Sequence, residues 1–234
     1  MSGIAQNLQA VQNGIAAAAC AAERDPAAVR LLAVSKTFGP EAVIAAAQAG
    51  QSAFGENYLQ EALDKIAAVH AARPELQLEW HFIGPIQSNK TRSIAENFDW
   101  VHSVEREKVA QRLSQQRPTH LPPLNVCLQV NISGEASKSG ATPEQLPALA
   151  QAVAVMPHLR LRGLMAIPEA AQTFEQQRLP FQQLHQLFEQ LNTQGLALDT
   201  LSIGMSADMA AAIAEGATIV RVGSAIFGKR DYGK

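Results

Sequence analysis

Short apolar runs alternate with amphipathic stretches along the whole chain. Residues 31–37 (LLAVSKT) form the first such run, and Phe38-Gly39-Pro40 follows it, a pattern typical of a buried strand that ends at a turn. Further strands are predicted at residues 52–57, 79–84, 100–104, 125–131, 159–167, 201–204 and 218–222. The stretches between them predict helices at residues 40–50, 58–72, 88–97, 105–116, 142–156, 174–194 (with Pro180 as a candidate kink) and 207–215.

An additional helix is predicted ahead of the first strand. Ile4, Leu8, Val11 and Ile15 recur at helical spacing, so the first twenty or so residues form an amphipathic helix. Strands that alternate with helices indicate a parallel sheet, and eight such units fit a closed (β/α)₈ barrel. We therefore expect an α/β protein, a single TIM barrel domain over residues 1–234 preceded by an N-terminal helix.

The competing arrangement is an open, doubly wound sheet. That fold would favour a G-x-G-x-x-G turn after the first strand. Here the turn is Lys36-Thr37-Phe38-Gly39-Pro40, which does not match. The pattern therefore favours the barrel.

Composition excludes several classes of protein. The chain is 47% hydrophobic and 17% charged with a formal net charge of -2, which indicates a globular protein and gives no basic surface for nucleic acid. Cys20 and Cys127 form no C-x-x-C pair and have no zinc-ligand spacing. The longest run of small apolar residues, 15–22, is too short to cross a bilayer. We expect a cytoplasmic protein without membrane or nucleic-acid partners.

Lys36 is the first candidate for chemistry. Of the seven lysines (36, 65, 90, 108, 138, 229, 234), only Lys36 directly follows an apolar run, and the other six are expected in helical or loop-like polar surroundings. Burial lowers the pKa of a lysine, and the neutral amine is the form that makes a Schiff base. The alternative is a lysine at a strand end with a buried stem and a solvated head.

In a barrel the carboxyl ends of the strands form the active face. Residues predicted at these ends are Lys36, Asn57, His81, Asn131, Met165, Ser202 and Arg221. Strand ends are also where any chain changes from apolar to polar, so some of these residues could be ordinary first residues of loops.

Residues 202–206 (SIGMS) and 221–224 (RVGS) place small residues and hydroxyls after the seventh and eighth strands, where barrels commonly bind phosphate. Two tight turns that need glycine would give the same pattern. A lysine on the first strand that faces a phosphate site on the last two suggests pyridoxal 5′-phosphate, which carries an aldehyde and a phosphate.

Several motifs carry a family resemblance over essentially the whole chain. They are residues 34–37 (VSKT), 54–58 (FGENY), 80–90 (WHFIGPIQSNK), 162–165 (RGLM), 201–206 (LSIGMS) and 221–228 (RVGSAIFG). The chain resembles the YggS/PROSC family of pyridoxal phosphate homeostasis proteins, and the motif at residues 81–90 is long enough to be highly specific. The fold of this family resembles the barrel domain of alanine racemase.

The resemblance implies roles for individual residues. Lys36 corresponds to the lysine that holds the cofactor as an internal aldimine. Ser206, Gly223 and Ser224 look like phosphate binders, and Arg221 is expected near the pyridine nitrogen. The predicted cofactor-binding set is Lys36, Asn57, His81, Met165, Ser202, Ser206, Arg221, Gly223 and Ser224, with no catalytic residue and no metal.

The first functional hypothesis is a protein that binds, buffers and delivers pyridoxal phosphate for vitamin B6 and amino-acid homeostasis, without strong turnover. An arginine that faces the pyridine nitrogen keeps this nitrogen unprotonated, which makes the ring a weaker electron sink. Enzymes that lack their pyridoxal phosphate are the implied recipients, and we expect a monomer. Lys138, in the glycine- and serine-rich loop at residues 134–140, is a second amine that could take part in transfer.

Two alternatives stay open. An amino-acid racemase of the alanine racemase type needs a base on each face of the cofactor, usually the lysine and a tyrosine from a second domain. Only Tyr58 and Tyr232 are present, and the sequence ends about ten residues after the eighth strand, so we expect no such second domain. A phosphate-binding barrel without an aldimine would leave the position of Lys36 unexplained.

Overall fold

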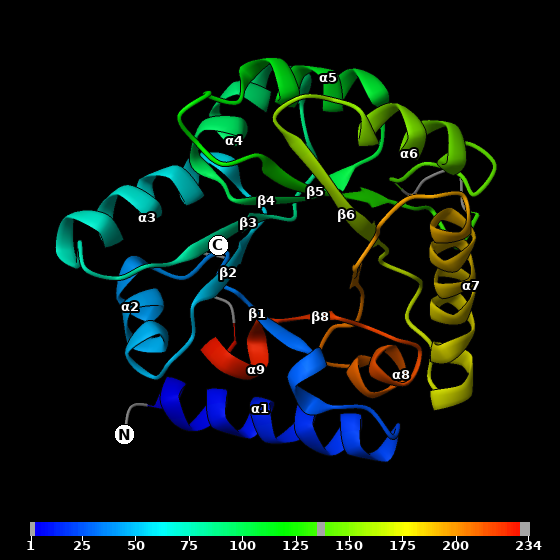
Figure 1. Cartoon of the computed structure of the whole chain (residues 1–234). Helices are drawn as coiled ribbons and strands as arrows, with labels where there is room; N and C mark the ends of the chain where they lie inside the picture. The colour runs from blue at the N-terminus through cyan, green and yellow to red at the C-terminus, as the bar shows by residue number, and fades with distance from the viewer. Residues whose placement is uncertain (1–2, 135–138, 230–234) are drawn as a thin grey trace.

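Eight parallel strands pair in chain order into a closed barrel in the computed structural model, which describes residues 3–134 and 139–229 (Figure 1). The first and last strands pair with each other, with Arg30 opposite Ile219 and Ala33 opposite Val222, and this pairing closes the sheet. The predicted (β/α)₈ barrel is confirmed, and the open doubly wound alternative does not apply.

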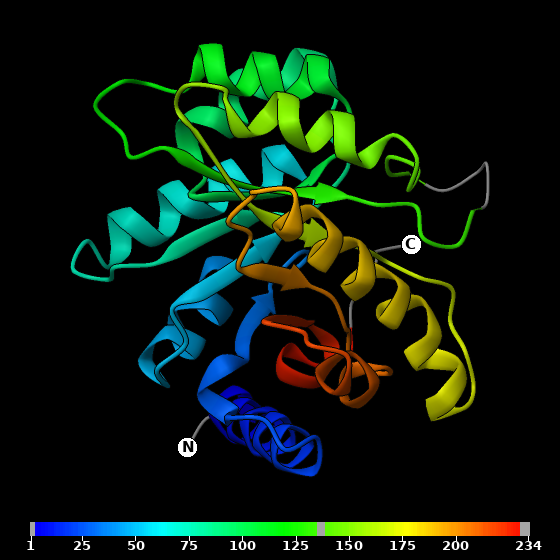
Figure 2. The same cartoon turned by 45° about the vertical axis from the view of Figure 1, so that its right-hand side comes forward.

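The strands are short and most are followed by a helix that covers the outside of the sheet (Figure 1, Figure 2). The strands are β1 (Arg30–Val34), β2 (Ala53–Glu56), β3 (Glu79–Phe82), β4 (Trp100–Val104), β5 (Leu124–Gln129), β6 (Leu159–Met165), β7 (Thr200–Ser202) and β8 (Ile219–Val222). The helices are α1 (Gly3–Ala21), α2 (Pro40–Gln48), α3 (Leu59–Ala72), α4 (Thr91–Asn97), α5 (Glu107–Gln116), α6 (Leu146–Ala154), α7 (Phe174–Thr193), α8 (Met209–Ala214) and α9 (Ser224–Phe227).

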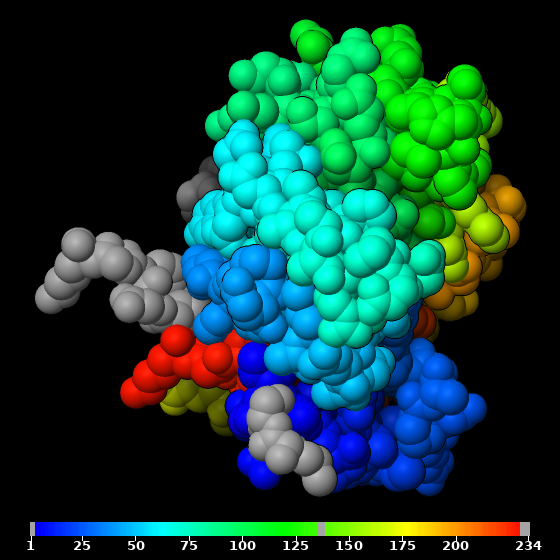
Figure 3. All heavy atoms as spheres, turned by 90° about the vertical axis from the view of Figure 1, so that its left-hand side faces the viewer, coloured from blue at the N-terminus to red at the C-terminus, as the bar shows by residue number. Residues whose placement is uncertain are grey.

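The predicted N-terminal helix is α1. Leu8, Val11 and Ile15 are buried at the predicted spacing, because this stripe packs against α8 and α9. The side chain of Asn7 donates a hydrogen bond to the Ile226 carbonyl oxygen in α9 (3.0 Å). Figure 3 shows α2 and α3 side by side on the adjoining face, above α1. Helix α1 therefore covers the part of the barrel where β1 pairs with β8 and closes the sheet.

Alternate residues of each strand point into the barrel. On β1, Leu32 and Val34 belong to the apolar cluster inside the barrel, whereas Leu31 and Ala33 belong to the core between the strands and the helices. Trp100, Cys127, Met165 and Ile219 complete much of the inner cluster. The same alternation places Lys36, two residues after Val34, at the mouth of the barrel.

Differences from the predicted elements are confined to their ends and to short helices. The helix predicted from residue 142 begins at Leu146, because residues 142–145 form a turn closed by hydrogen bonds from Gln145 and Leu146 to Thr142. Short 3₁₀ helices occur at Pro26–Ala28 and Ser88–Lys90, and α9 follows β8, where no helix was predicted. Helix α7 continues through Pro180.

Three residues named in the sequence analysis, Lys138, Tyr232 and Lys234, lie outside the described residues. Within the described ranges, no helix combines the length and apolar character that a membrane span requires. The cytoplasmic location stays a prediction.

Candidate functional site

A cavity of about 320 Å³ lies at the carboxyl ends of the strands, the end at which (β/α)₈ barrels carry their sites. Its volume falls in the range of pockets that hold small ligands and cofactors. The lining residues are Val34, Lys36, Asn57, Ile83, Ile167, Met205, Ser206, Ala207, Arg221, Gly223 and Ser224.

Much of the predicted cofactor-binding set meets at this cavity, namely Lys36, Asn57, Ser206, Arg221, Gly223 and Ser224. Lys36 follows β1 and Arg221 lies on β8, and these two strands are paired. Closure of the barrel therefore brings the amine from the start of the sequence to the small and hydroxyl residues from its end. The part that each residue plays in binding stays a prediction.

Side chains from β2 and α3 hold the turn that carries Lys36. The Ser35 hydroxyl donates to Glu56 Oε1 (2.6 Å), and the Thr37 N–H donates to Glu61 Oε1 (2.6 Å). Thr37 has a φ of 69°, a left-handed conformation that is uncommon for a β-branched residue. Hydrogen bonds on both sides of Lys36 hold the turn, and the half-buried Lys36 side chain lines the cavity from it.

Lys65 lies at the centre of the same group. Its Nζ donates to the Ser35 carbonyl oxygen (2.7 Å), to Glu56 Oε1 (2.6 Å) and to Glu61 Oε1 (2.9 Å). Lys65 has the helical, polar surroundings that were expected, but it is only 3% exposed, so these surroundings are buried side chains and backbone rather than solvent. Burial raises the pKa of Glu56, and the charge of Lys65 opposes that rise.

The position of Lys65 in the sequence indicates that this lysine is buried. Lys65 occupies the apolar stripe of α3, between the buried residues Ala62 and Val69. A charged side chain within such a stripe needs buried partners, since an unpaired buried charge is very costly. We conclude that Lys65 has a structural role beneath the Lys36 turn.

The turns after β7 and β8 bring hydroxyl and N–H groups to the cavity. Gly204 has a φ of 91°, and a Cβ there would lie 2.6 Å from the Ala212 side chain, so this glycine is a turn requirement. Gly223 follows β8 with a φ of -119° and a ψ of -77°. Ser206 and Ser224 are exposed at the cavity wall, and the first N–H groups of α9 have no partner within the helix.

Arg221 places a fixed positive charge at the base of the cavity. Its Nη1 donates to the carbonyl oxygen of Ser202 and, at 2.9 Å, to the Ser202 hydroxyl, and its Nη2 donates to the Ala166 carbonyl oxygen at 3.0 Å. Burial lowers the pKa of Arg221 to about 10, so the guanidinium stays protonated at neutral pH. The charge is therefore held by β7 and by the residue that directly follows β6.

The other predicted residues do not line the cavity. His81, Met165 and Ser202 are fully buried in the barrel interior. Met165 packs in the inner apolar cluster, and the two polar residues bond to other interior side chains. Asn131 also lies away from the cavity, where its N–H binds the Ala141 carbonyl oxygen (2.9 Å). Strand-end position alone did not distinguish an interior side chain from one at the mouth.

The cavity fits a small ligand that carries an aldehyde and an anionic group. The Lys36 amine can condense with an aldehyde. The hydroxyls of Ser206 and Ser224 and the N–H groups of α9 can donate to an anion. Asn57 Oδ1 is buried and has no hydrogen-bond partner among the described residues, so it is an acceptor that a ligand could satisfy.

Comparison with known proteins gives a consistent result. The family model for the alanine racemase N-terminal domain matches residues 6–231. The pyridoxal phosphate homeostasis protein of Pseudomonas aeruginosa is 63% identical, over 100% of this chain and 98% of that protein, and the Escherichia coli K12 protein of the same name is 53% identical over the full length of both.

Among solved structures, PipY of Synechococcus elongatus with PLP bound superposes with a TM-score of 0.83 at 35% identity. The match covers 96% of this chain and 100% of PipY. The likeness therefore extends over the whole barrel rather than over one motif.

Proposed function

Because the chain belongs to the YggS/PROSC family of pyridoxal phosphate homeostasis proteins, we propose that it binds pyridoxal 5′-phosphate at the described cavity and contributes to the homeostasis of this cofactor. We further propose that the cofactor is held as an aldimine of Lys36. In that state it would be buffered and then delivered to enzymes that lack it.

One observation carries the proposal. Lys36, Ser206, Gly223 and Ser224 line a single cavity, although they come from the two ends of the sequence. An aldehyde and a phosphate on the same small ligand match this arrangement of one amine opposite hydroxyl and N–H donors.

Arg221 supports a binding role rather than demanding turnover. A protonated guanidinium beside the pyridine nitrogen disfavours protonation of that nitrogen, because two adjacent positive charges repel. The bound ring is then a weak electron sink, which allows Schiff-base formation but gives little help to carbanion chemistry.

The test uses purified protein incubated with pyridoxal phosphate. Borohydride reduction followed by peptide mapping is expected to place the adduct on Lys36, with a visible Schiff-base absorption band before reduction. Lys36→Arg keeps the charge but cannot form the Schiff base, so this variant is expected to lose the band while its circular dichroism is unchanged.

Lys108→Ala is the matched control, because Lys108 is exposed on α5 and lies outside the cavity lining. This variant is expected to keep the band. Modification of another lysine in the parent protein, or an unchanged band in Lys36→Arg, would contradict the assignment.

Delivery is tested separately. Protein loaded with pyridoxal phosphate is mixed with a pyridoxal phosphate enzyme stripped of its cofactor, and recovery of that enzyme's activity is followed. Direct transfer is supported if the activity recovers faster than the loaded protein releases pyridoxal phosphate into solution. If recovery is only as fast as this release, the protein stores pyridoxal phosphate but does not pass it directly to the enzyme.

The racemase alternative has one observation in its favour, the match to the alanine racemase N-terminal domain. Within the described part of the chain, Tyr58 is the only tyrosine, and Lys36 Nζ lies 6.0 Å from the centre of its ring. Incubation with L-alanine and an assay for D-alanine separates the two functions, and we expect no significant racemisation.

A further inference from the structure

A continuous line of polar side chains crosses the interior of the barrel beneath the cavity. Glu79 Oε1 lies 2.6 Å from His81 Nε2, and His81 Nδ1 lies 2.8 Å from His102 Nε2. His102 Nδ1 lies 2.7 Å from Ser202 Oγ, which lies 2.9 Å from Arg221 Nη1. We call these five residues the Glu79–Arg221 chain.

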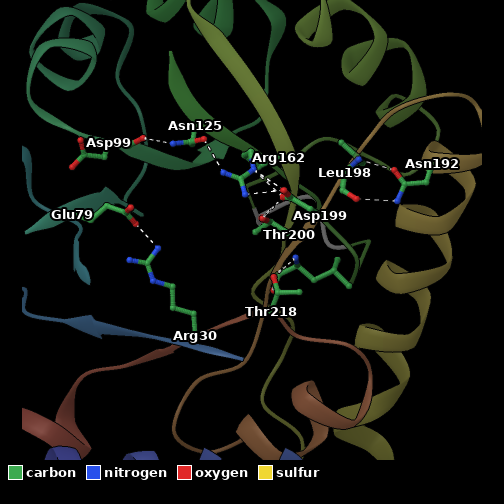
Figure 4. A network of polar contacts seen from close by, with 11 residues as sticks. Arg30, Glu79, Asp99, Asn125, Arg162, Asn192, Leu198, Asp199, Thr200 and Thr218 are labelled. Carbon is green, nitrogen blue, oxygen red and sulfur yellow. Dashed lines mark hydrogen bonds and ion pairs between the residues drawn. The ribbon is translucent and has the colours of Figure 1, made fainter. Parts of the chain in front are cut away.

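The Glu79–Arg221 chain joins the two ends of the barrel. Glu79 begins β3 at the amino end, where Arg30 binds its carboxylate (2.6 Å; Figure 4). Arg221 reaches the cavity at the carboxyl end. The imidazoles of His81 and His102 and the hydroxyl of Ser202, which lies between His102 and Arg221, are completely buried. They fill barrel layers that are usually occupied by branched apolar side chains, so the polar filling carries a desolvation cost.

When both imidazoles are neutral, the two ends of the Glu79–Arg221 chain determine the direction of every hydrogen bond in it. Arg221 can only donate and the Glu79 carboxylate can only accept. His81 must therefore donate from Nε2 to Glu79 and accept at Nδ1 from His102 Nε2–H. His102 then accepts at Nδ1 from Ser202, whose oxygen accepts from Arg221.

This assignment requires both imidazoles to be neutral with the proton on Nε2. Burial lowers the pKa of both His81 and His102, which agrees with that state. Bonds from His81 and Arg30 outweigh the opposing effect of burial and lower the pKa of Glu79 to about 2, so the carboxylate is ionised. The other carboxylate at this end, Asp99, accepts from the Trp80 N–H (2.8 Å).

In every bond of the Glu79–Arg221 chain, the donor lies on the side of the Arg221 cation and the acceptor on the side of the Glu79 anion. Hydrogen bonds that share one direction polarise one another. Among the described residues, the Ser202 hydroxyl is the only side-chain acceptor bound by Arg221. We propose that Glu79, His81 and His102 are positioning residues for the cofactor, which act through Ser202 to orient Arg221 and polarise its guanidinium. This inference rests on the proposed pyridoxal phosphate site.

The first test needs no cofactor. In the unloaded protein labelled with ¹⁵N, the imidazole resonances of His81 and His102 are expected to show Nε2–H tautomers at neutral pH. A protonated imidazole or an Nδ1–H tautomer at either residue would break the direction of the chain and overturn the proposal.

The second test is a double-mutant cycle. Glu79→Gln keeps a neutral acceptor, so it is expected to shift the side-chain ¹⁵N resonance of Arg221 and to weaken pyridoxal phosphate binding by about threefold. Ser202→Ala removes the last link and is expected to weaken binding by about tenfold. In the Ser202→Ala background, Glu79→Gln should have no further effect on either quantity.

Thr200→Val is the matched control background. Thr200 lies two residues before Ser202 on β7, on the same face of the strand. Its hydroxyl donates to Asp199 and takes no part in the Glu79–Arg221 chain. The response to Glu79→Gln is expected to persist there. A response that also persists in Ser202→Ala would show an effect of charge through space and would overturn the proposal.

A third pair of variants distinguishes positioning from filling of space. His102→Gln can still accept from Ser202 and donate to His81, so its binding is expected to lie closer to the parent than that of His102→Leu. Equal binding in the two variants would assign His102 to packing alone. If His102→Leu does not fold, the double-mutant cycle of Glu79 and Ser202 still tests the proposal.

Failure of the parent protein to bind pyridoxal phosphate would defeat the proposed function. The imidazole and Arg221 resonances of the unloaded protein would still decide whether the Glu79–Arg221 chain orients Arg221.

Discussion

Ser206 and Ser224 reach the cavity from two different turns, and each offers one hydroxyl to an anion. A hydrogen bond to a charged group contributes about 1.5–3 kcal/mol, so Ser206→Ala and Ser224→Ala are each expected to weaken pyridoxal phosphate binding by about tenfold or more. Both side chains are exposed, so the free energy of unfolding should hardly change. Equilibrium dialysis and urea denaturation measure the two quantities.

Ser52→Ala is the control for these two serines. Ser52 is also exposed but precedes β2 at the amino end of the barrel. Unchanged affinity in the Ser206→Ala/Ser224→Ala double variant would place the anionic group of the cofactor elsewhere.

Glu79 predicts a specific dependence of stability on pH. Its pKa falls from the ordinary 4.5 to about 2 in the folded state, so the unfolded chain takes up the proton first on acidification. The stabilisation is fully present above about pH 4.5 and is lost as the pH falls from there towards 2. The side chain is 33% exposed, so the expected contribution is only about 1 kcal/mol.

The comparison is with Glu79→Gln, which does not titrate. Between about pH 6 and pH 3 the free energy of unfolding should fall further in the parent than in this variant, as measured by urea denaturation at each pH. Parallel curves would show that Glu79 is not selectively stabilised as the anion.

At the residue scale, the sequence identified charged groups near the ends of strands but not buried polar groups whose partners lie elsewhere in the fold. Lys36 and Arg221 stand out because charge follows or interrupts a hydrophobic strand. His102 and Lys65 were missed, because their partners come from other strands or helices and only the folded barrel brings those partners within bonding distance. The alternation of inward positions on β4 would have placed His102 beside Trp100 inside the barrel.

At the scale of elements, glycine predicts opposite effects at two positions. Gly163 on β6 is paired with Thr200 on β7, and a Cβ there would lie 1.7 Å from the Thr200 carbonyl oxygen. Because backbone on both strands would have to move, Gly163→Ala is expected to cost about 3 kcal/mol. Gly14 lies inside α1, where a Cβ would make an ordinary contact with Met209 (3.5 Å).

Gly14→Ala is therefore expected to stabilise the protein by about 0.5–1 kcal/mol through its helix propensity. Urea denaturation of the two variants beside the parent gives both signs in one experiment. A neutral Gly163→Ala would mean that β6 and β7 can separate without loss of the barrel.

The order and type of the long elements were predictable from hydrophobic periodicity, because each strand and helix buries one face or stripe. Their ends were less predictable. The start of α6 depends on a turn closed around Thr142, and α9 is a single short helix whose residues also fit an extended tail. Such features depend on local hydrogen bonds that leave little trace in the hydrophobic pattern.

At the scale of the whole molecule, the monomer expected from the sequence stays a prediction. The large exposed apolar side chains of the described residues are Tyr58, Val155, Ile167, Phe174, Leu179 and Met205, and two of them, Ile167 and Met205, line the cavity. Stable dimers usually bury a contiguous apolar surface. Sedimentation equilibrium is expected to give the 25.0 kDa of one chain at all loading concentrations, and a mass that rises towards twice this value would contradict the prediction.

The closed architecture was predictable from the count of strand and helix units, because eight parallel units fit a ring. The pairing that completes the ring was not visible in any local pattern. Arg30 and Ile219 are opposite each other only because every intermediate strand has found its neighbour.

Pairing of β1 with β8 also has a consequence for a chain that is still being made. Lys36 leaves the ribosome early, but Arg221, Gly223 and Ser224 are among the last described residues to be translated. At ordinary rates of synthesis the interval between Lys36 and Arg221 is on the order of ten to forty seconds. If the proposed site is right, a nascent chain has the lysine without the opposite wall of the cavity, and selective capture of pyridoxal phosphate must wait until β8 and α9 have been made.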